Sequence, residues 1–354
     1  MGKSSLLDIV FKDNDNVVWF NGDNITTQDT FRTLTPSLVP VIMAGKTIMI
    51  IDEAQAIENI GSKLKVIHDN YPNIKIVATG SSSFDLSNKI NEPLTGRFFQ
   101  FMMSPLMFSE MLQHHGYLKE KECLNIRLKY GYYPAIVTNP GFEAEMLTNL
   151  AGSYLYKDIL MWENIRHSDK LDKLLKAVAY QIGSDVSYSE LGSLCSLDSK
   201  TVEKYIYLLE KAFVIFRLPS YSRNQRNELK FAKKIYFYDV GIRNAVINNF
   251  SDIESRTDNG AIWENFIISE RIKLNAIQGR IVNSYFWRTN TQVEIDYIEE
   301  SDGRIEAYEF KSELAKRFRK TIDSWASIAA GFGTFFSNPD ASAKSGSGGD
   351  DYSL

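Results

Sequence analysis

The sequence predicts a multidomain α/β protein that begins with a parallel β-sheet and continues into helical and mixed α/β regions. Three short apolar runs, rich in β-branched residues, alternate with helix-compatible stretches over the N-terminal third of the chain. Strands that are buried on both faces of a parallel sheet have this continuous apolar character. The length of 354 residues exceeds what one hydrophobic core supports, so two or three domains are expected.

Composition and charge exclude several classes of protein. The chain is 44% hydrophobic and 24% charged, which is typical of soluble globular proteins. No apolar run reaches the roughly 18 residues that a membrane span needs, and the N-terminus lacks the layout of a signal peptide. The two cysteines, Cys123 and Cys195, form neither a metal-binding nor a disulfide pattern. A cytoplasmic protein without a membrane partner is expected, and its net charge of −4 confines any nucleic-acid contact to a local basic patch.

The predicted strands of the N-terminal sheet are Asn16–Phe20, Thr47–Ile51 and Ile74–Thr79. Helices are expected between them, near Thr27–Ala44 and Glu58–Asp69, because strands that alternate with helices build a parallel sheet. Ligands of open α/β sheets bind beyond the carboxyl ends of the strands. The residues that follow these strands are therefore the first candidates for a site.

Two short motifs indicate a nucleotide site at this edge of the sheet. Gly2-Lys3-Ser4 matches the second half of a P-loop, whose backbone N–H groups, lysine and hydroxyl hold phosphates and Mg²⁺. The second strand ends in Asp52-Glu53, as a Walker B strand does, and Glu53 is predicted to polarise the attacking water. The alternative is an ordinary strand followed by a helix with Asp52 as its N-cap. The residues predicted to bind ATP are Gly2, Lys3, Ser4, Ser5 and Asp52, with Ser4 and Asp52 also binding Mg²⁺.

Further polar groups follow the third strand. Ser81 or Ser82 is predicted to sense the γ-phosphate, although a Gly-Ser run is also an ordinary turn from strand to helix. Arg97 is predicted to stabilise the transferred charge, as an arginine finger does. Its alternative is a solvated surface arginine.

The C-terminal segment Gln292–Lys311 reads as a hairpin that turns at Asp302-Gly303, a favoured pair for a two-residue type I′ turn. This turn places Asp296 directly opposite Glu309, and Glu294 opposite Lys311. All four side chains should share one face of the hairpin, with Val293, Ile295 and Tyr297 on the other face.

Like charges that face each other across a sheet destabilise it by up to about 1 kcal/mol, so a bound cation is expected to offset the pair Asp296 and Glu309. Metal-dependent nucleases hold Mg²⁺ with such acids while a lysine, here Lys311, orients or activates water. Glu264, on the preceding helix, is a further acid for the same site. The alternative is a solvated hairpin face with a salt bridge between Glu294 and Lys311.

The middle of the chain is predicted to be helical and then to form a winged helix. Two helices are expected within Val186–Lys211, the second with Asp198 as its N-cap. Two strands, Val214–Leu218 and Ile235–Tyr238, follow and are joined by a basic loop. A wing of this charge suits phosphate contacts, but wings also bind proteins, so DNA and another protein are both open as partners. The candidate nucleic-acid contacts are Arg223, Arg226, Lys230, Lys233 and Lys234.

The ordered series of motifs resembles a prokaryotic family of AAA-type ATPases that are usually called ATP-binding proteins. The resemblance extends over residues 2–336. It implies ATP binding through Lys3, Ser4, Asp52 and Glu53, and a C-terminal domain of unknown function with a PD-(D/E)XK nuclease-like fold. Because the sequence starts inside the Walker A motif, an N-terminally truncated member is expected. The segments that carry the resemblance are TIMIIDEAQ, KIVATGSSS, EPLTGRFFQFMMSPLMFSE, Gly131–Ala135, Tyr156–Asp158, Tyr236–Gly241 and Trp263–Asn265.

The expected function is that of an ATP-binding P-loop ATPase, acting as an ATP-dependent regulator or a nucleic-acid-associated factor. Two alternatives stay open, a Mg²⁺-dependent nuclease gated by the NTPase domain and a protein-interaction scaffold that does not hydrolyse ATP. The predicted domains are a P-loop ATPase core (1–107), a helical lid (108–180), a winged helix (181–240), a PD-(D/E)XK nuclease-like domain (241–338) and a disordered tail (339–354).

Overall fold

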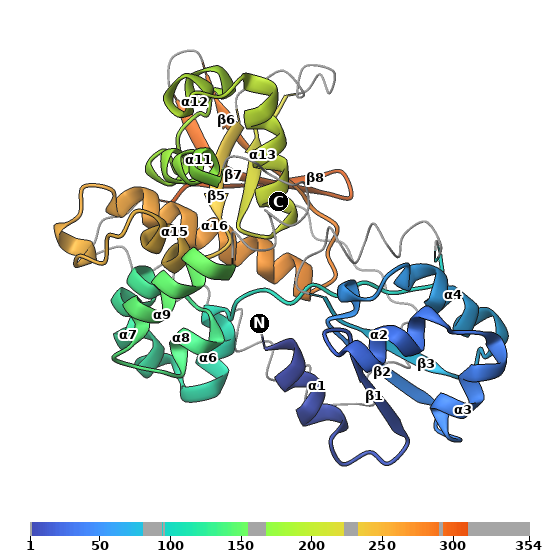
Figure 1. The fold of residues 1–354 in the computed structure, drawn as a ribbon. Helices are drawn as coiled ribbons and strands as arrows, with labels where there is room; N and C mark the ends of the chain where they lie inside the picture. Colours follow the sequence, from blue (N-terminus) through green and yellow to red (C-terminus); the bar gives the residue numbers. More distant parts are fainter. Residues whose placement is uncertain are drawn as a thin grey trace, which may run out of the picture.

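The computed structural model describes residues 2–80, 94, 96–154, 168–222, 233–289 and 293–310. The N-terminal sheet and its helices (blue in Figure 1) form one unit, and an extended segment connects it to a larger unit of helices and antiparallel strands. The predicted disordered tail from residue 339 lies outside the described residues. Within the described ranges, no helix is long and apolar enough to cross a membrane.

The N-terminal sheet is parallel, as the apolar runs predict. Its strands are β1 (Val17–Asn21), β2 (Ile48–Asp52) and β3 (Lys75–Ala78), and β2 lies between the other two. Residues Met49, Ile50 and Ile51 of β2 are fully buried, because helices cover both faces of this central strand.

Helices cover the sheet on two sides. On one side, Leu7 of α1 packs with Val17 and Ile50, and on the other Phe31 and Ile60 belong to a separate cluster. The helical character predicted near Thr27–Ala44 is confirmed. The stretch is divided into several short helices, since its two prolines disfavour a continuous one. The helical elements are α1 (Lys3–Phe11), α2 (Ile25–Arg32), η1 (Pro36–Leu38), α3 (Val39–Met43), η2 (Ala54–Ala56) and α4 (Ile60–Asn70).

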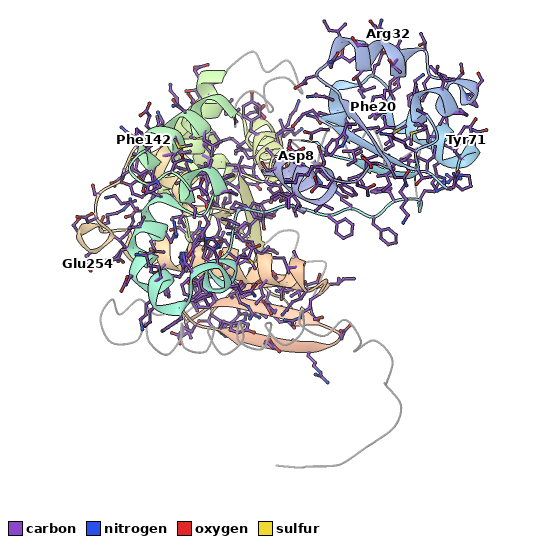
Figure 2. All side chains as sticks on the ribbon, turned by 90° about the horizontal axis from the view of Figure 1, so that it is seen from below. Asp8, Phe20, Arg32, Tyr71, Phe142 and Glu254 are labelled. Carbon is purple, nitrogen blue, oxygen red and sulfur yellow. The ribbon has the colours of Figure 1, made fainter. Side chains whose placement is uncertain are left out.

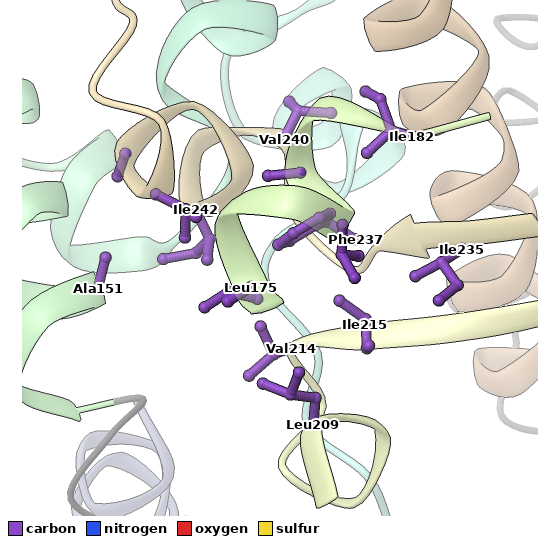
Figure 3. Packing of buried hydrophobic residues seen from close by; sticks show 14 of the residues in the cluster. Ala151, Leu175, Ile182, Leu209, Val214, Ile215, Ile235, Phe237, Val240 and Ile242 are labelled. Atoms are coloured by element: carbon purple, nitrogen blue, oxygen red, sulfur yellow. The ribbon is translucent and has the colours of Figure 1, made fainter. Parts of the chain in front are cut away.

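The middle of the chain shares one large hydrophobic core. Figure 3 shows Leu175, Leu209, Ile215, Phe237 and Ile242 meeting there from different elements. The same core reaches the first half of α16 through Trp263 and Phe266. Its elements are α6 (Phe108–His115), α7 (Tyr117–Tyr130), α8 (Pro134–Val137), α9 (Glu143–Asn149), η3 (Leu150–Tyr154), α11 (Ser168–Tyr180), α12 (Tyr188–Cys195), α13 (Ser199–Lys211), β4 (Ile215–Pro219), β5 (Lys233–Phe237), α15 (Val240–Val246), η4 (Ile253–Ser255) and α16 (Asn259–Ile277).

The C-terminal strands β6 (Asn283–Arg288), β7 (Glu294–Ser301) and β8 (Arg304–Tyr308) form an antiparallel sheet in that order. The predicted turn is confirmed, because Asp302 and Gly303 both have positive φ, 52° and 76°, as a type I′ turn requires. The β4–β5 hairpin lies next to this sheet, since the Tyr221 N–H donates to Phe286 O at 2.6 Å.

The predicted pairing of β7 with β8 is confirmed from the turn back to Tyr297 and Tyr308, but β7 carries a β-bulge on its other side. Between the pairs Tyr285–Ile298 and Trp287–Ile295, β7 has two residues, Asp296 and Tyr297, where β6 has only Phe286. A bulge interrupts the alternation of side chains and re-aims them. Tyr297 therefore packs with Ile268 of α16, on the helix that also carries the acidic neighbour of Asp296. The prediction that Tyr297 lies on the opposite face from Asp296 is wrong for this reason.

Candidate functional site

The two nucleotide-binding motifs meet in space, although 48 residues separate them in the sequence. The Ser4 hydroxyl, in the first turn of α1, donates to Asp52 Oδ2 at 2.5 Å. Asp52 is the last residue of the central strand β2, so its carboxylate lies at the carboxyl edge of the sheet, where open α/β sheets bind ligands. A hydroxyl and a carboxylate in contact are oxygen donors of the kind that Mg²⁺ prefers.

A second hydroxyl holds the other oxygen of the same carboxylate. Thr79, directly after β3, donates its hydroxyl to Asp52 Oδ1, and the backbone N–H of Glu53 also donates to that oxygen at 3.2 Å. Thr79 was not among the predicted site residues, although its place at the end of a neighbouring parallel strand was a usable signal. The carboxylate is thus oriented from α1, β2 and β3 together.

These contacts set the charge state of Asp52. Partial burial on its own raises the pKa of this carboxyl group, but the hydrogen bonds from Ser4 and Thr79 and the nearby charge of Lys3 outweigh burial and lower the pKa. Asp52 is therefore ionised at neutral pH, as a metal ligand must be.

Glu53 follows at a sharp turn in the backbone. It has φ +49°, a left-handed conformation that is rare outside glycine, and Gln55 Nε2 donates to Glu53 Oε2 at 2.5 Å. The turn brings the Glu53 carbonyl against Gly22 at the end of β1, where a Cβ atom would lie only 2.1 Å from that carbonyl oxygen. Gly22 is thus required for this close approach of two backbone segments.

The remaining residues of the predicted phosphate site also lie at the start of α1. Gly2 precedes the helix with φ +76°, Lys3 is half-buried and Ser5 is exposed. The first N–H groups of a helix lack partners within it and favour anions. A Cβ atom built on Gly2 would lie 3.3 Å from Met103 Cε, so this end of α1 touches the segment that leads to the helical unit.

Arg97, which was predicted to act as an arginine finger, pairs with an acid of α4. Its Nε lies 3.4 Å from Asp69 Oδ1, in the last turn of α4. Because α4 starts beyond the carboxyl end of β2 and leads back to the start of β3, its last turn lies toward the opposite edge of the sheet. The other two predicted catalytic groups, Ser81 and Ser82, lie outside the described residues.

A second group of acids lies at the junction of α16 and the C-terminal sheet. Carboxylate oxygens of Glu264, Glu294 and Asp296 lie within 4.8 Å of one another. Glu264 and Asp296 were predicted to share a metal site, and the structure does bring them together. Glu309 was predicted to be the other acid of this site, but the third acid in the structure is Glu294. The pairing of β7 with β8 ends at Tyr308, before it reaches Glu309. Lys311, the predicted nuclease-like lysine, lies outside the described residues.

A lysine from another element stands among these acids. Lys234 of β5 places its Nζ 3.2 Å from Glu264 Oε1 and also contacts Glu294 Oε1. Lys234 is 1% exposed, and its ammonium group pairs with carboxylates inside the protein. The prediction that Lys234 contacts nucleic acid is therefore wrong. Lys233 is half-buried over the ring of Tyr188, and the other predicted contacts, Arg223, Arg226 and Lys230, lie outside the described residues.

The pKa values of Asp296 and Glu294 shift in opposite directions. Burial, together with the charges of Glu264 and Glu294, raises the pKa of Asp296 to about 6, although the Phe310 N–H donates to its Oδ2 at 2.6 Å. Burial also raises the pKa of Glu294, but contacts with Lys234 and Arg288 outweigh burial, so its net shift is downward. The two neighbouring acids thus differ because the cations lie beside Glu294.

Three protein families match successive parts of the chain. The family described as AAA domain matches residues 1–112. A domain of unknown function (DUF8612) matches residues 122–253, and another (DUF4143) matches residues 259–341. The matches cover the N-terminal sheet, the helical middle with the β4–β5 hairpin, and the C-terminal sheet with α16.

Similar proteins occur in bacteria and archaea. An uncharacterized protein of Haemophilus influenzae is 24% identical over 250 residues, 66% of this chain and 62% of that protein. One of Mycobacterium tuberculosis is 24% identical over 327 residues, 91% of this chain and 70% of that protein. One of Methanocaldococcus jannaschii is 23% identical over 265 residues, 70% of this chain and 57% of that protein.

No solved structure shows a significant match to the chain. The family matches agree with the motifs at both ends of the sequence. The chain therefore carries an AAA domain of the P-loop ATPase type at its N-terminus and a domain of unknown function (DUF4143) at its C-terminus.

Proposed function

We propose that the chain binds Mg·ATP at the start of α1 and hydrolyses it. The observation that carries the proposal is the 2.5 Å hydrogen bond between Ser4 and Asp52, which joins the helix start of one motif to the strand end of the other. P-loop ATPases need this pairing, because the serine and the Walker B aspartate bind the same Mg²⁺ ion. The AAA domain match over residues 1–112 supports the same function.

Each residue of the site has a role in this proposal. Ser4 and Asp52 would hold Mg²⁺, which supplies positive charge to the β- and γ-phosphates. Lys3 adds positive charge beside the phosphates, and the free N–H groups at the start of α1 donate to phosphate oxygens. Glu53 accepts a hydrogen bond from the attacking water. Thr79 orients Asp52 and does not itself contact the nucleotide.

The test is Mg²⁺-dependent ATP turnover by the full chain. Asp52→Ala and Glu53→Gln are each expected to reduce turnover by at least about 100-fold, since they remove a metal ligand and the group that polarises water. Asp8→Asn is the matched control, because Asp8 is an exposed acid on α1. If Glu53→Gln turns over ATP as fast as the wild type, the hydrolytic role of this site is refuted.

Binding is measured separately from hydrolysis by titrating a fluorescent ATP analogue. Lys3→Ala is expected to weaken binding by at least about tenfold, because it removes a charge beside the phosphates. Lys12→Ala is the control, since Lys12 is an exposed lysine at the other end of the same helix. If the chain binds the analogue but does not hydrolyse ATP, a protein-interaction scaffold would describe its function better than an ATPase.

We further propose that the ATPase acts as a regulator through its middle region, whose helices and hairpin would contact a partner. Asp198 caps α13 by accepting from the Lys200 and Thr201 N–H groups, and β4 and β5 follow as an antiparallel pair. This order supports the winged-helix interpretation. The exposed residues of α13 mix Lys200 and Lys204 with Glu203, and this balance of charge favours a protein partner over DNA.

Metal-dependent cleavage of nucleic acid is the second candidate function. The grouping of Glu264, Glu294 and Asp296 favours it, but the Lys234 ammonium already contacts two of these acids. DNA cleavage that Asp296→Ala abolishes would support it, and its absence with Mg²⁺ or Mn²⁺ would remove it.

A further inference from the structure

Lys234 belongs to a different part of the fold from the acids that surround it. It lies on β5, whose partner in its sheet is β4, whereas Glu264 lies on α16 and Glu294 on β7. The ammonium group contacts both carboxylates and lies 5.2 Å from the centre of the Phe286 ring. Its side chain is 2% exposed, so water does not supply its hydrogen bonds.

The carboxylates depend on this lysine for much of their compensation. Glu264 receives one further bond, from the Tyr236 hydroxyl at 2.5 Å. Glu294 is shared with Arg288, which also pairs with Asp185. A buried charge is tolerated only when it is paired and hydrogen-bonded. Lys234 is thus the single described cation that contacts both acids, and it arrives from outside the domain that contains them.

We propose that Lys234 is a built-in cation of this acidic group, and that it locks the β4–β5 hairpin onto the C-terminal sheet. The ammonium lies where a divalent cation would otherwise interact with Glu264 and Glu294. Withdrawal of Lys234 would leave Glu264 without this cation and Glu294 with Arg288, and would therefore make the group able to bind a cation. The inference depends on the geometry of this group and does not require the N-terminal domain to hydrolyse ATP.

The first test measures how fast the lysines of the full wild-type chain react with an amine-acylating reagent. Lys233, the half-buried neighbour on the same strand, is the internal control. Lys234 is expected to react at least about tenfold more slowly than Lys233, because acylation requires local opening of the hairpin. Equal rates at the two positions would overturn the lock.

The second test removes the charge and keeps the length of the side chain. Lys234→Met is expected to gain binding of Mn²⁺, the probe ion, with at least about tenfold higher affinity than the wild type, because the carboxylates lose the cation that they share and attract another. The gain should vanish in Lys234→Met with Glu294→Gln, and Lys233→Met should behave as the wild type. Titrations are made without nucleotide, so the dependence on Glu294 separates this site from Ser4 and Asp52.

Two outcomes would refute the proposal. One is a wild type that binds Mn²⁺ through Glu294 as tightly as Lys234→Met does, and the other is a folded Lys234→Met that gains no binding. If Lys234→Met does not fold, the double variant Glu264→Gln and Glu294→Gln replaces it in the acylation assay. Lys234 should then react at a rate close to that of Lys233, and unchanged protection would overturn the lock.

Discussion

Single hydroxyl groups determine how the Asp52 carboxylate is presented. Ser4 holds one oxygen and Thr79 the other, so the carboxylate has no freedom to rotate about its last bond without losing a hydrogen bond. Thr79 is 9% exposed, which places its hydroxyl where water does not easily replace it. The orientation of this carboxylate, the proposed metal ligand, is therefore fixed by the fold before any ligand binds.

Thr79→Val removes this hydroxyl with little change in shape. We expect Mg²⁺-dependent ATP turnover to fall by about 10- to 100-fold, the usual effect of losing a group that orients a metal ligand. The Mg²⁺ concentration for half-maximal turnover should rise, and Thr79→Ser, which keeps the hydroxyl, should restore both values. An unchanged Mg²⁺ requirement in Thr79→Val would mean that Thr79 has only a structural role.

At this scale the sequence predicted the polar residues at the helix start and the strand end better than the groups that orient them. Ser4 and Asp52 follow from motifs, because the chemistry of phosphate binding fixes their types and their places at strand and helix ends. Lys234 was assigned to the surface for its charge, since a single residue does not reveal that Glu264 and Glu294 surround it. The partners of a charged residue depend on the tertiary fold, which local sequence does not encode.

At the scale of elements, a buried aspartate fastens α15 to the end of α7. Asp239 accepts from the Gly241 and Ile242 N–H groups at the start of α15 and from the Tyr132 N–H at 2.7 Å. It is 3% exposed, and burial raises its pKa despite these bonds. Gly131 allows this contact, because a Cβ atom there would lie 1.9 Å from Asp239 Oδ1.

Asp239→Ala and Asp198→Ala compare a buried helix cap with an exposed one. Asp239→Ala leaves buried N–H groups without an acceptor, so we expect the free energy of unfolding to fall by at least about 3 kcal/mol. Asp198→Ala removes only the exposed cap of α13 and should lower it by about 1 kcal/mol. Urea unfolding followed by circular dichroism measures both values, and equal losses would contradict the role assigned to Asp239.

Strand positions and the C-terminal turn followed from the sequence to within a few residues, because apolar runs and an Asp-Gly pair carry local signals. The bulge in β7 did not. The turn at Asp302-Gly303 fixes the register with β8 only, whereas the bulge arises where β7 meets β6. The pairing of β7 with β6 depends on packing against α16. The alternation of side chains along β7 does not predict this pairing.

At the scale of the whole molecule, the described residues contain two separate sets of hydrophobic cores. The clusters of the N-terminal sheet draw on residues up to Leu94, and the other clusters draw on residues from Phe108 onward. No buried residue belongs to both sets among the described positions. The two units should therefore unfold as separate cooperative units, in spite of their covalent connection.

One substitution in each core tests this separation. Ile50→Ala and Leu209→Ala each remove a fully buried side chain and should each destabilise their own unit by about 2–5 kcal/mol. Hydrogen exchange read by mass spectrometry should show faster exchange within residues 3–78 for Ile50→Ala and within residues 108–277 for Leu209→Ala. Faster exchange across both units in either variant would show that they unfold together.

The first turn of α1 lies at the boundary between these two units. Its side toward the sheet carries Ser4, bonded to Asp52, and Gly2 at its start lies close to Met103 and Pro134. Figure 2 shows Asp8 of the same helix between Phe20 of the sheet and Phe142 of the helical unit. A ligand that binds only the docked arrangement stabilises it by about 2.7 kcal/mol at a concentration 100 times its Kd. We therefore expect occupancy of the proposed phosphate site to make the two halves separate less often, so that nucleotide concentration would control the shape of the molecule.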